Sequence, residues 1–214
     1  MGSLSQMRVP TFALWYERVC RTEVGEVRRR SAADAKRPLR LNDEMTTVRR
    51  CTPVDIEACV TIVHALPDHF TDDVPAKVAD DLRTHHGWVA AGSDAILGFV
   101  VVAQRSRHAA EVLWLAVAPA AQRIGIATRL LDQALDELHA DGLKIVETKT
   151  LDASVDYPPY NGTRAFWQQY GFVQVDTIDP LPGWQPGNPA AIYIAALTAT
   201  TSRQRTGHSS RRTP

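Results

Sequence analysis

The segment best suited to chemistry is a short loop between an apolar strand and a long helix. The strand ends at Val117–Ala118, Pro119 interrupts it, and Gly125 with the small Ala127 opens the helix. Backbone amides at a helix start, together with the positive end of the helix dipole, can hold a pyrophosphate, and a glycine lets the backbone approach it closely. The other interpretation of these residues is an ordinary strand–loop–helix connection with an incidental glycine.

Other motifs for chemistry are missing from the sequence. It contains neither the GxxxxGK[ST] motif of P-loops nor the full GxGxxG of dinucleotide-binding folds, and it has no serine hydrolase elbow. His85, His86 and His108 have no partner at metal-ligand spacing, so we expect no metal site. The phosphate loop is therefore the strongest chemical signal.

The elements that must position this loop alternate along the chain. Periodicity predicts strands over Thr47–Cys51, Trp88–Ala91, Ala95–Gln104, Glu111–Ala118, Leu143–Thr150, Phe172–Val175 and Ala190–Leu197. It predicts helices after Thr52 and over Val74–Thr84, Gly125–Ala140 and Asn161–Tyr170. Thr52, Pro53 and Asp55 form a variant of the capping box. The order of elements predicts a mixed α/β sheet with helices on both faces.

Composition limits the class of protein. The 214 residues are 44% hydrophobic and 22% charged, which is typical of a soluble globular protein. The apolar runs are too short to span a bilayer, so no membrane association is expected. The three cysteines form no CxxC pair and no leader sequence is evident, which favours a reducing, cytoplasmic location.

Charge is segregated along a chain whose formal net charge is zero. Residues 1–45 carry nine basic and six acidic side chains, and the last sixteen residues carry four arginines. The segment between them holds 11 basic and 18 acidic residues, a balance of −7. A negative body binds nucleic acid poorly and can attract cationic small molecules, although acids that only solubilise the surface explain the balance equally well.

Three segments follow from these patterns. Residues 1–45 are expected to be disordered or an appended extension, with a short amphipathic helix over Thr11–Cys20 as one option. Residues 46–198 are expected to form the catalytic domain. Residues 199–214 form an Arg/Ser/Thr-rich tail that is expected to be disordered.

The phosphate loop resembles a known family. The run Val117-x-Pro119-x-x-Gln122-Arg123-Ile124-Gly125-Ile126-Ala127 is similar to the [Q/R]xxGx[G/A] loop of the GNAT acetyltransferase superfamily. The resemblance covers about Thr46 to Leu197 and includes the opening Val48–Asp55 and the late Asn161…Ala165-Phe166…Gly171-Phe172. It implies the GNAT fold: a mixed, mostly antiparallel central sheet of about six to seven strands, helices on both faces, and a splayed cleft between the central strands.

The resemblance also implies where acetyl-CoA would bind as a cosubstrate. The loop amides would hold the pyrophosphate, and the backbone of the strand before the loop would pair with the pantetheine arm. Asn161 and Trp167 would line the cofactor from the later helix, although Trp167 could instead simply pack in the core. The expected cofactor-binding residues are Leu115, Ala116, Val117, Gln122, Arg123, Ile124, Gly125, Ile126, Ala127, Thr128, Asn161 and Trp167.

Transfer of an acetyl group to an amine requires a base, because a free amine is largely protonated at neutral pH. The position of Glu111 at the start of the central strand resembles that of the general-base glutamate in the histone acetyltransferase branch. It could instead mark only the polar end of a buried strand. Trp167 stands where the family usually has a tyrosine that acts as the general acid for the leaving thiolate. The nearby Tyr170 is therefore the candidate general acid, and Tyr160 is the other candidate.

The sequence thus predicts an N-acetyltransferase that moves acetyl from acetyl-CoA to a primary amine by direct attack in a ternary complex. A catalytically degenerate acyl-CoA sensor is the alternative. The expected partner is a small-molecule or peptide amine, with no nucleic acid and no membrane, and a homodimer is left open. The proline-rich segment Asp179–Pro189, with Trp184, could frame the acceptor pocket or be an inert connector.

Overall fold

Seven strands form one mixed sheet that parts in its middle. The computed structural model describes residues 46–197, and its sheet has the strand order β1-β2-β3-β4-β5-β7-β6. The strands are β1 (Thr47–Arg50), β2 (His86–Ala91), β3 (Ile96–Gln104), β4 (Ala109–Val117), β5 (Ile145–Leu151), β6 (Val173–Ile178) and β7 (Ala190–Ala196). Within this sheet the β4–β5 pair is parallel and the other pairs are antiparallel. The predicted fold class is confirmed.

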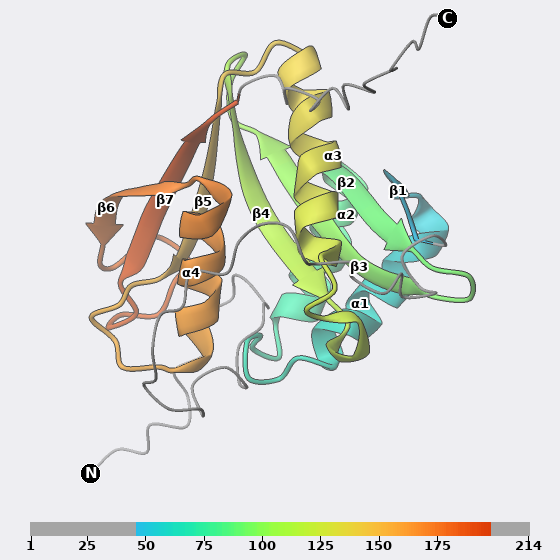
Figure 1. Ribbon diagram of the computed structural model, residues 1–214. Coiled ribbons are helices and arrows are strands. Elements are labelled where there is room, and N and C mark those ends of the chain that lie inside the picture. The colour runs from blue at the N-terminus through green and yellow to red at the C-terminus, as the bar shows by residue number, and fades with distance from the viewer. Residues whose placement is uncertain (1–45, 198–214) are drawn as a thin grey trace, which may run out of the picture.

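Helices cover both faces of this sheet (Figure 1). They are α1 (Ile56–His64), α2 (Val74–Thr84), α3 (Ile126–Ala140) and α4 (Pro159–Tyr170), with short 3-10 turns over Pro53–Asp55 and Pro119–Ala121. Side chains of β3 alternate between the two layers, as the period of a strand requires. Val100 and Val102 pack with Leu130 of α3, whereas Phe99 and Val101 pack with α1 and α2 on the other face.

The parting lies between the two central strands. β4 and β5 pair only from Ala109↔Ile145 to Val112↔Thr148, although β5 continues to pair with β7 as far as Leu151. The register of β4 against β3 jumps at Leu113, because Val101 is paired with Trp114 and Val102 with Val112. Such a bulge bends its strand and increases the local twist. Beyond Val112, β4 therefore follows β3 while β5 follows β7.

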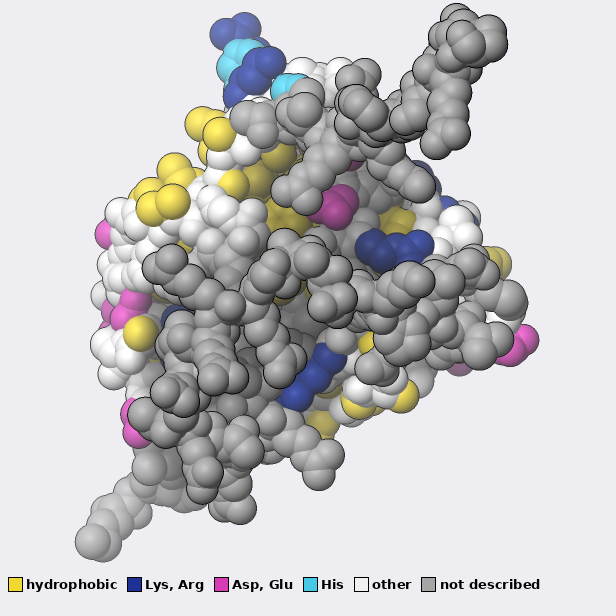
Figure 2. Space-filling model, in the orientation of Figure 1, with side chains coloured by type: hydrophobic (Ala, Val, Ile, Leu, Met, Phe, Trp, Pro, Cys, Tyr) yellow, Lys and Arg dark blue, Asp and Glu magenta, His cyan; other side chains and the backbone are white. Residues whose placement is uncertain are grey.

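The strand at one edge of the sheet is exposed and partly apolar. β6 pairs only with β7, and Val173 and Val175 are 63% and 52% exposed. Figure 2 shows hydrophobic side chains at the upper left, over this end of the sheet. β6 reaches Ile178, three residues beyond the predicted end at Val175, because its pairing with β7 continues to Ile178↔Ala190. All of its residues are exposed, and past Val175 its sequence lacks the alternating apolar pattern that would have indicated this length.

Several predictions concern residues beyond this part of the chain. The helix proposed for Thr11–Cys20 and the two tails lie outside the described residues 46–197, so the three-segment division stays a prediction. None of the helices within 46–197 is long and apolar enough to cross a membrane.

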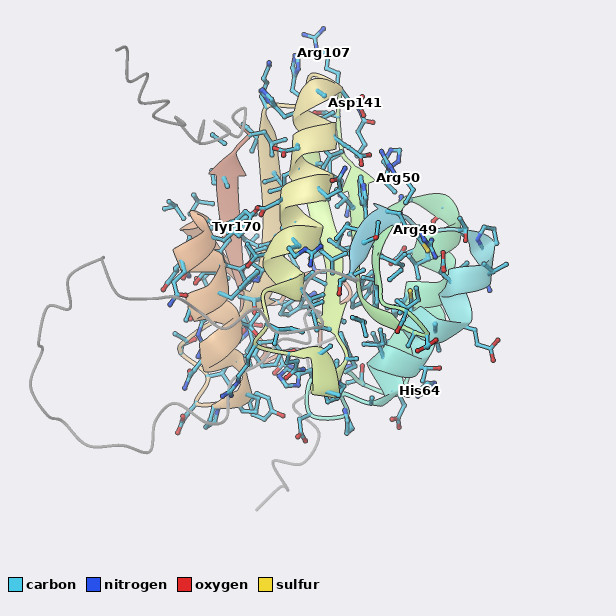
Figure 3. The ribbon with its side chains drawn as sticks, turned by 45° about the vertical axis from the view of Figure 1, so that its right-hand side comes forward. Arg49, Arg50, His64, Arg107, Asp141 and Tyr170 are labelled. Atoms are coloured by element: carbon cyan, nitrogen blue, oxygen red, sulfur yellow. The ribbon has the colours of Figure 1, made fainter. Side chains whose placement is uncertain are left out.

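A buried carboxylate fixes the start of the first helical segment. Asp55 accepts hydrogen bonds from both terminal nitrogens of Arg49, at 2.7 and 2.8 Å, and from the backbone N–H of Thr52 at 2.8 Å. The Arg49 guanidinium holds the pKa of Asp55 well below its usual range. Figure 3 shows Arg49 beside the helices on this side of the sheet. The predicted capping box is confirmed, and Arg49 anchors it to β1.

We expect Asp55→Asn to lower the free energy of unfolding by about 1–3 kcal/mol at pH 7, because it removes the negative charge that pairs with Arg49 and leaves an amide that can still cap. The folded pKa lies below the unfolded value of about 3.9, so this stabilisation is present above about pH 4 and is lost as pH falls further. Urea unfolding at pH 7, 5 and 3 measures it. Asp141→Asn, at the exposed end of α3, is the control. An Asp55→Asn deficit as large at pH 3 as at pH 7 would contradict the assignment.

Candidate functional site

One cavity opens at the start of α3, on the face of the sheet that α3 and α4 cover. Its volume is about 220 Å³. It is lined by Val117, Ala121, Gln122, Arg123, Gly125, Ile126, Ala127, Thr128, Phe166 and Gln169. The loop predicted to hold a pyrophosphate thus forms most of one cavity wall, and α4 supplies the rest.

The loop backbone has the conformation of an anion site. Arg123 and Gly125 both have positive φ, 68° and 89°, and Arg123 is the one non-glycine residue within 46–197 in that region. Such a conformation is costly for a residue with a side chain and is concentrated at functional sites. The first bond of α3 runs from Arg129 N–H to Gly125 C=O at 3.1 Å, so the amides of residues 126–128 have no partner inside the helix. Successive amides of this kind form a concave donor set for phosphate.

The end of β4 offers further backbone groups to this cavity. Ala118 N–H donates to Leu97 C=O on the β3 side at 2.8 Å. Because hydrogen-bonding directions alternate along a strand, the amide of Val117 points the other way, toward the gap where β5 has left. Gln122 Nε2 donates to the Val117 carbonyl at 3.2 Å and ties the loop to the strand. Leu115 and Ala116 are core residues whose side chains line neither cavity.

Two residues predicted to contact the cofactor lie elsewhere. Trp167 is fully buried and packs edge-on against Phe172, with ring centroids 4.8 Å apart. Asn161 is exposed at the start of α4, and its side-chain oxygen accepts a hydrogen bond from Arg164. The face of α4 that lines the cavity carries Phe166 and Gln169 instead. Phe166 and Gln169 are three residues apart, a spacing that places both side chains on one face of a helix.

The predicted acid is also displaced. Tyr170 ends α4 beside α3, and its hydroxyl donates to Asp132 of α3 at 2.5 Å (Figure 3). Burial, together with that bond, raises the pKa of Tyr170, and the residue lines neither cavity. Its substitute, Tyr160, is fully buried and donates to the His69 carbonyl at 3.2 Å, and burial raises its pKa. The geometry gives both tyrosines packing roles rather than that of an acid.

A second cavity lies on the opposite face of the sheet. Its volume is about 190 Å³. It is lined by Lys77 of α2, Glu111, Leu113 and Trp114 of β4, Lys149 of β5, and Pro182, Gly183 and Trp184 of the loop between β6 and β7. Glu111 was predicted from the sequence. For the loop that carries Trp184, the sequence left two roles open, an acceptor-pocket wall or an inert connector, and Trp184 lines this cavity. Lys77 and Lys149 were missed, because they come from segments distant in sequence and form no motif.

Glu111 is nearly buried and forms ion pairs with two basic side chains. Its Oε1 accepts from Lys149 Nζ at 2.7 Å, and its Oε2 accepts from Arg105 Nε at 2.7 Å. Lys149 also contacts Glu147 at 2.6 Å. A buried carboxylate needs such partners, because removal from water is costly. The network fixes the Glu111 carboxylate at the wall of the second cavity.

Both cavities border the part of β4 near or beyond the point where it leaves β5. Leu113 and Lys149 are the first residues of β4 and β5 beyond the last paired position, Val112↔Thr148, and both line the second cavity. Val117, farther along β4, lines the first. β4 therefore contributes residues to both cavities, and the gap between β4 and β5 lies along the strand between them. Within residues 46–197 no group of three or more His, Cys, Asp or Glu is placed to hold a metal ion.

Residues 83–174 match the family model of the acetyltransferase (GNAT) domain. The predicted resemblance to the GNAT superfamily is confirmed over this part of the chain. Acyl transfer is the activity that the family supports. No curated protein sequence matches the chain.

Solved GNAT structures share this fold. A GNAT-family protein from Desulfovibrio desulfuricans superposes with a TM-score of 0.64 at 19% identity, over 72% of this chain and 99% of that one. The ribosomal-protein-S18-alanine N-acetyltransferase of Escherichia coli gives 0.58 at 16%, over 74% and 98%. A GNAT acetyltransferase from Elizabethkingia anophelis, solved with acetyl-CoA bound, gives 0.55 at 19%, over 72% and 99%. Identities this low establish the fold alone and leave the substrates of this chain open.

Proposed function

We propose that the protein transfers an acetyl group from acetyl-CoA to a primary amine by direct attack in a ternary complex. The observation that carries the proposal is the pair of cavities on opposite faces of the sheet, both lined by β4, with the β4–β5 pairing lost along that strand. A thioester held from one face and an amine held from the other would meet at this gap. That arrangement supplies proximity and orientation, which account for much of the rate of a bimolecular reaction.

The first cavity suits the cosubstrate. Its loop presents the helical amides of residues 126–128 together with the positive end of the α3 dipole, which favour a pyrophosphate. The amide of Val117, aimed at the gap, is placed to pair with an extended amide-bearing arm or to donate to the thioester oxygen. The acetyl-CoA bound to the Elizabethkingia anophelis enzyme supports this choice.

In the second cavity Glu111 would remove a proton from the ammonium form of the acceptor. The freed nitrogen forms a bond to the acetyl carbonyl carbon, and the carbon–sulfur bond breaks. One of the two remaining protons of the attacking nitrogen passes through solvent to the departing sulfur, and the other stays on the amide product. No tyrosine hydroxyl lines either cavity within residues 46–197, and a thiol with an ordinary pKa of about 8.5 needs no dedicated acid.

Gly125→Val should abolish the rise in melting temperature that acetyl-CoA causes, because a branched side chain would stand at the phosphate position of the loop. Gly142→Val is a matched control. Both glycines have φ near +90° with open space around the missing Cβ, so both variants carry the same backbone strain. Gly142 lies past the other end of α3, away from both cavities. Equal acetyl-CoA shifts in the two variants would refute the loop as the binding site.

Glu111→Gln should lower kcat/KM by about 10²–10⁴-fold, the usual contribution of a general base, with acetyl-CoA affinity nearly unchanged. Higher pH should partly restore the rate, because more acceptor then arrives deprotonated. Glu147→Gln is the matched control, since Glu147 lies opposite Glu111 in the β4–β5 pairing and also contacts Lys149. Equal losses in both variants would show that the ion-pair network matters rather than the base. Acetyl-CoA binding without turnover of any amine would favour a sensor.

A further inference from the structure

We infer that the acceptor is a small amine that also carries a carboxylate, such as a free α-amino acid. The inference rests on the proposed function and concerns the chemistry of the second cavity. Its charged lining consists of two lysines, Lys77 and Lys149, and one glutamate, Glu111. An acceptor with one amine and one anionic group can satisfy both signs of charge, whereas a simple amine satisfies only one.

The two lysines of this cavity differ in how strongly carboxylates of the protein hold them. Lys149 is held between Glu111 and Glu147, at 2.7 and 2.6 Å, and Glu111 is in turn shared with Arg105. Lys77 bonds Asp73 at 2.6 Å in an exposed pair on α2, with the two side chains 48% and 56% exposed. Exposed pairs of this kind are weak. Lys77 can therefore turn from Asp73 to a ligand carboxylate at little cost.

The position of the two lysines fits this recognition. Glu111 and Lys149 lie together at the parting of the strands, where the amine must be placed to reach the thioester. Lys77 contributes from α2, a separate wall of the same cavity. Trp114 and Leu113 of β4 and Trp184 of the β6–β7 loop supply the apolar surface between these charges. A carboxylate directed toward Lys77 would orient the amine toward Glu111.

The charge of the cavity disfavours other acceptors. Its lining carries a formal charge of +1, since two lysines face one glutamate. Polyamines and polycationic antibiotics would place a further cation against these two lysines, although the acidic balance of the segment between the two tails attracts them at a distance. The local charge of the cavity, rather than the charge of the whole body, determines what binds there.

Matched acceptor sets test this inference. Each set starts from alanine, leucine or phenylalanine and contains the amino acid, its carboxamide and the amine that lacks the carboxyl carbon. The measurement is kcat/KM calculated on the concentration of unprotonated amine. Spermidine is included as a polycation. We expect the free carboxylate to raise kcat/KM by at least about tenfold within the sets that react. Lys77→Met should remove most of that preference through KM. Lys144→Met, an exposed lysine outside the cavity, should leave the preference intact.

The outcomes separate the two proposals. Carboxamides, bare amines or spermidine that react as well as the amino acids would overturn the acceptor class while leaving acetyl transfer in place. A preference for the carboxylate that survives Lys77→Met would also overturn it. Failure of every amine, with acetyl-CoA still bound, would instead overturn the proposed function and this inference with it.

Discussion

The constraint on which the structure depends is the loss of pairing between two parallel strands inside a sheet. Past Val112↔Thr148, β4 and β5 no longer exchange hydrogen bonds, although each still pairs with its outer neighbour. Backbone N–H and C=O groups that face such a gap need partners, because leaving them unpaired away from water is costly. One is satisfied internally, since the Val117 carbonyl accepts from Gln122. The remaining edge is a template for an extended ligand that supplies its own amides.

The same parting explains the placement of the other elements. The bulge at Leu113 bends β4 away from β5 and turns Leu113 and Trp114 toward the α1 and α2 face. Val117 ends β4 on the α3 face, and the turn over Pro119–Ala121 leads directly to the amides of α3. One strand thus places groups at both cavities, six residues apart, from Glu111 to Val117.

Local signals were enough to predict most of the fold and the phosphate loop. The apolar stripe of α3, the glycine before it and the continuous apolar run of β4 each act within a few residues. The rotation of α4 was harder, because Phe166 and Trp167 are adjacent aromatic residues and packing decides which one faces the sheet. Thr163 and Trp167 are both fully buried, which turns Phe166 and Gln169 to the cavity. The cations around Glu111 were not predictable, since Lys149 lies 38 residues away in sequence.

The central claim is that the acyl end of the cosubstrate emerges at the parting of β4 and β5. A mixed disulfide of CoA with thiopyridine tests it directly on Leu113→Cys, whose thiol would stand at the gap. The control is Ile145→Cys, exposed at the closed end of the β4–β5 pairing, and the wild type accounts for the native cysteines. The account predicts that CoA couples to Leu113→Cys at least about tenfold faster than to Ile145→Cys, and that acetyl-CoA suppresses the difference. Equal coupling rates that acetyl-CoA does not affect would contradict it.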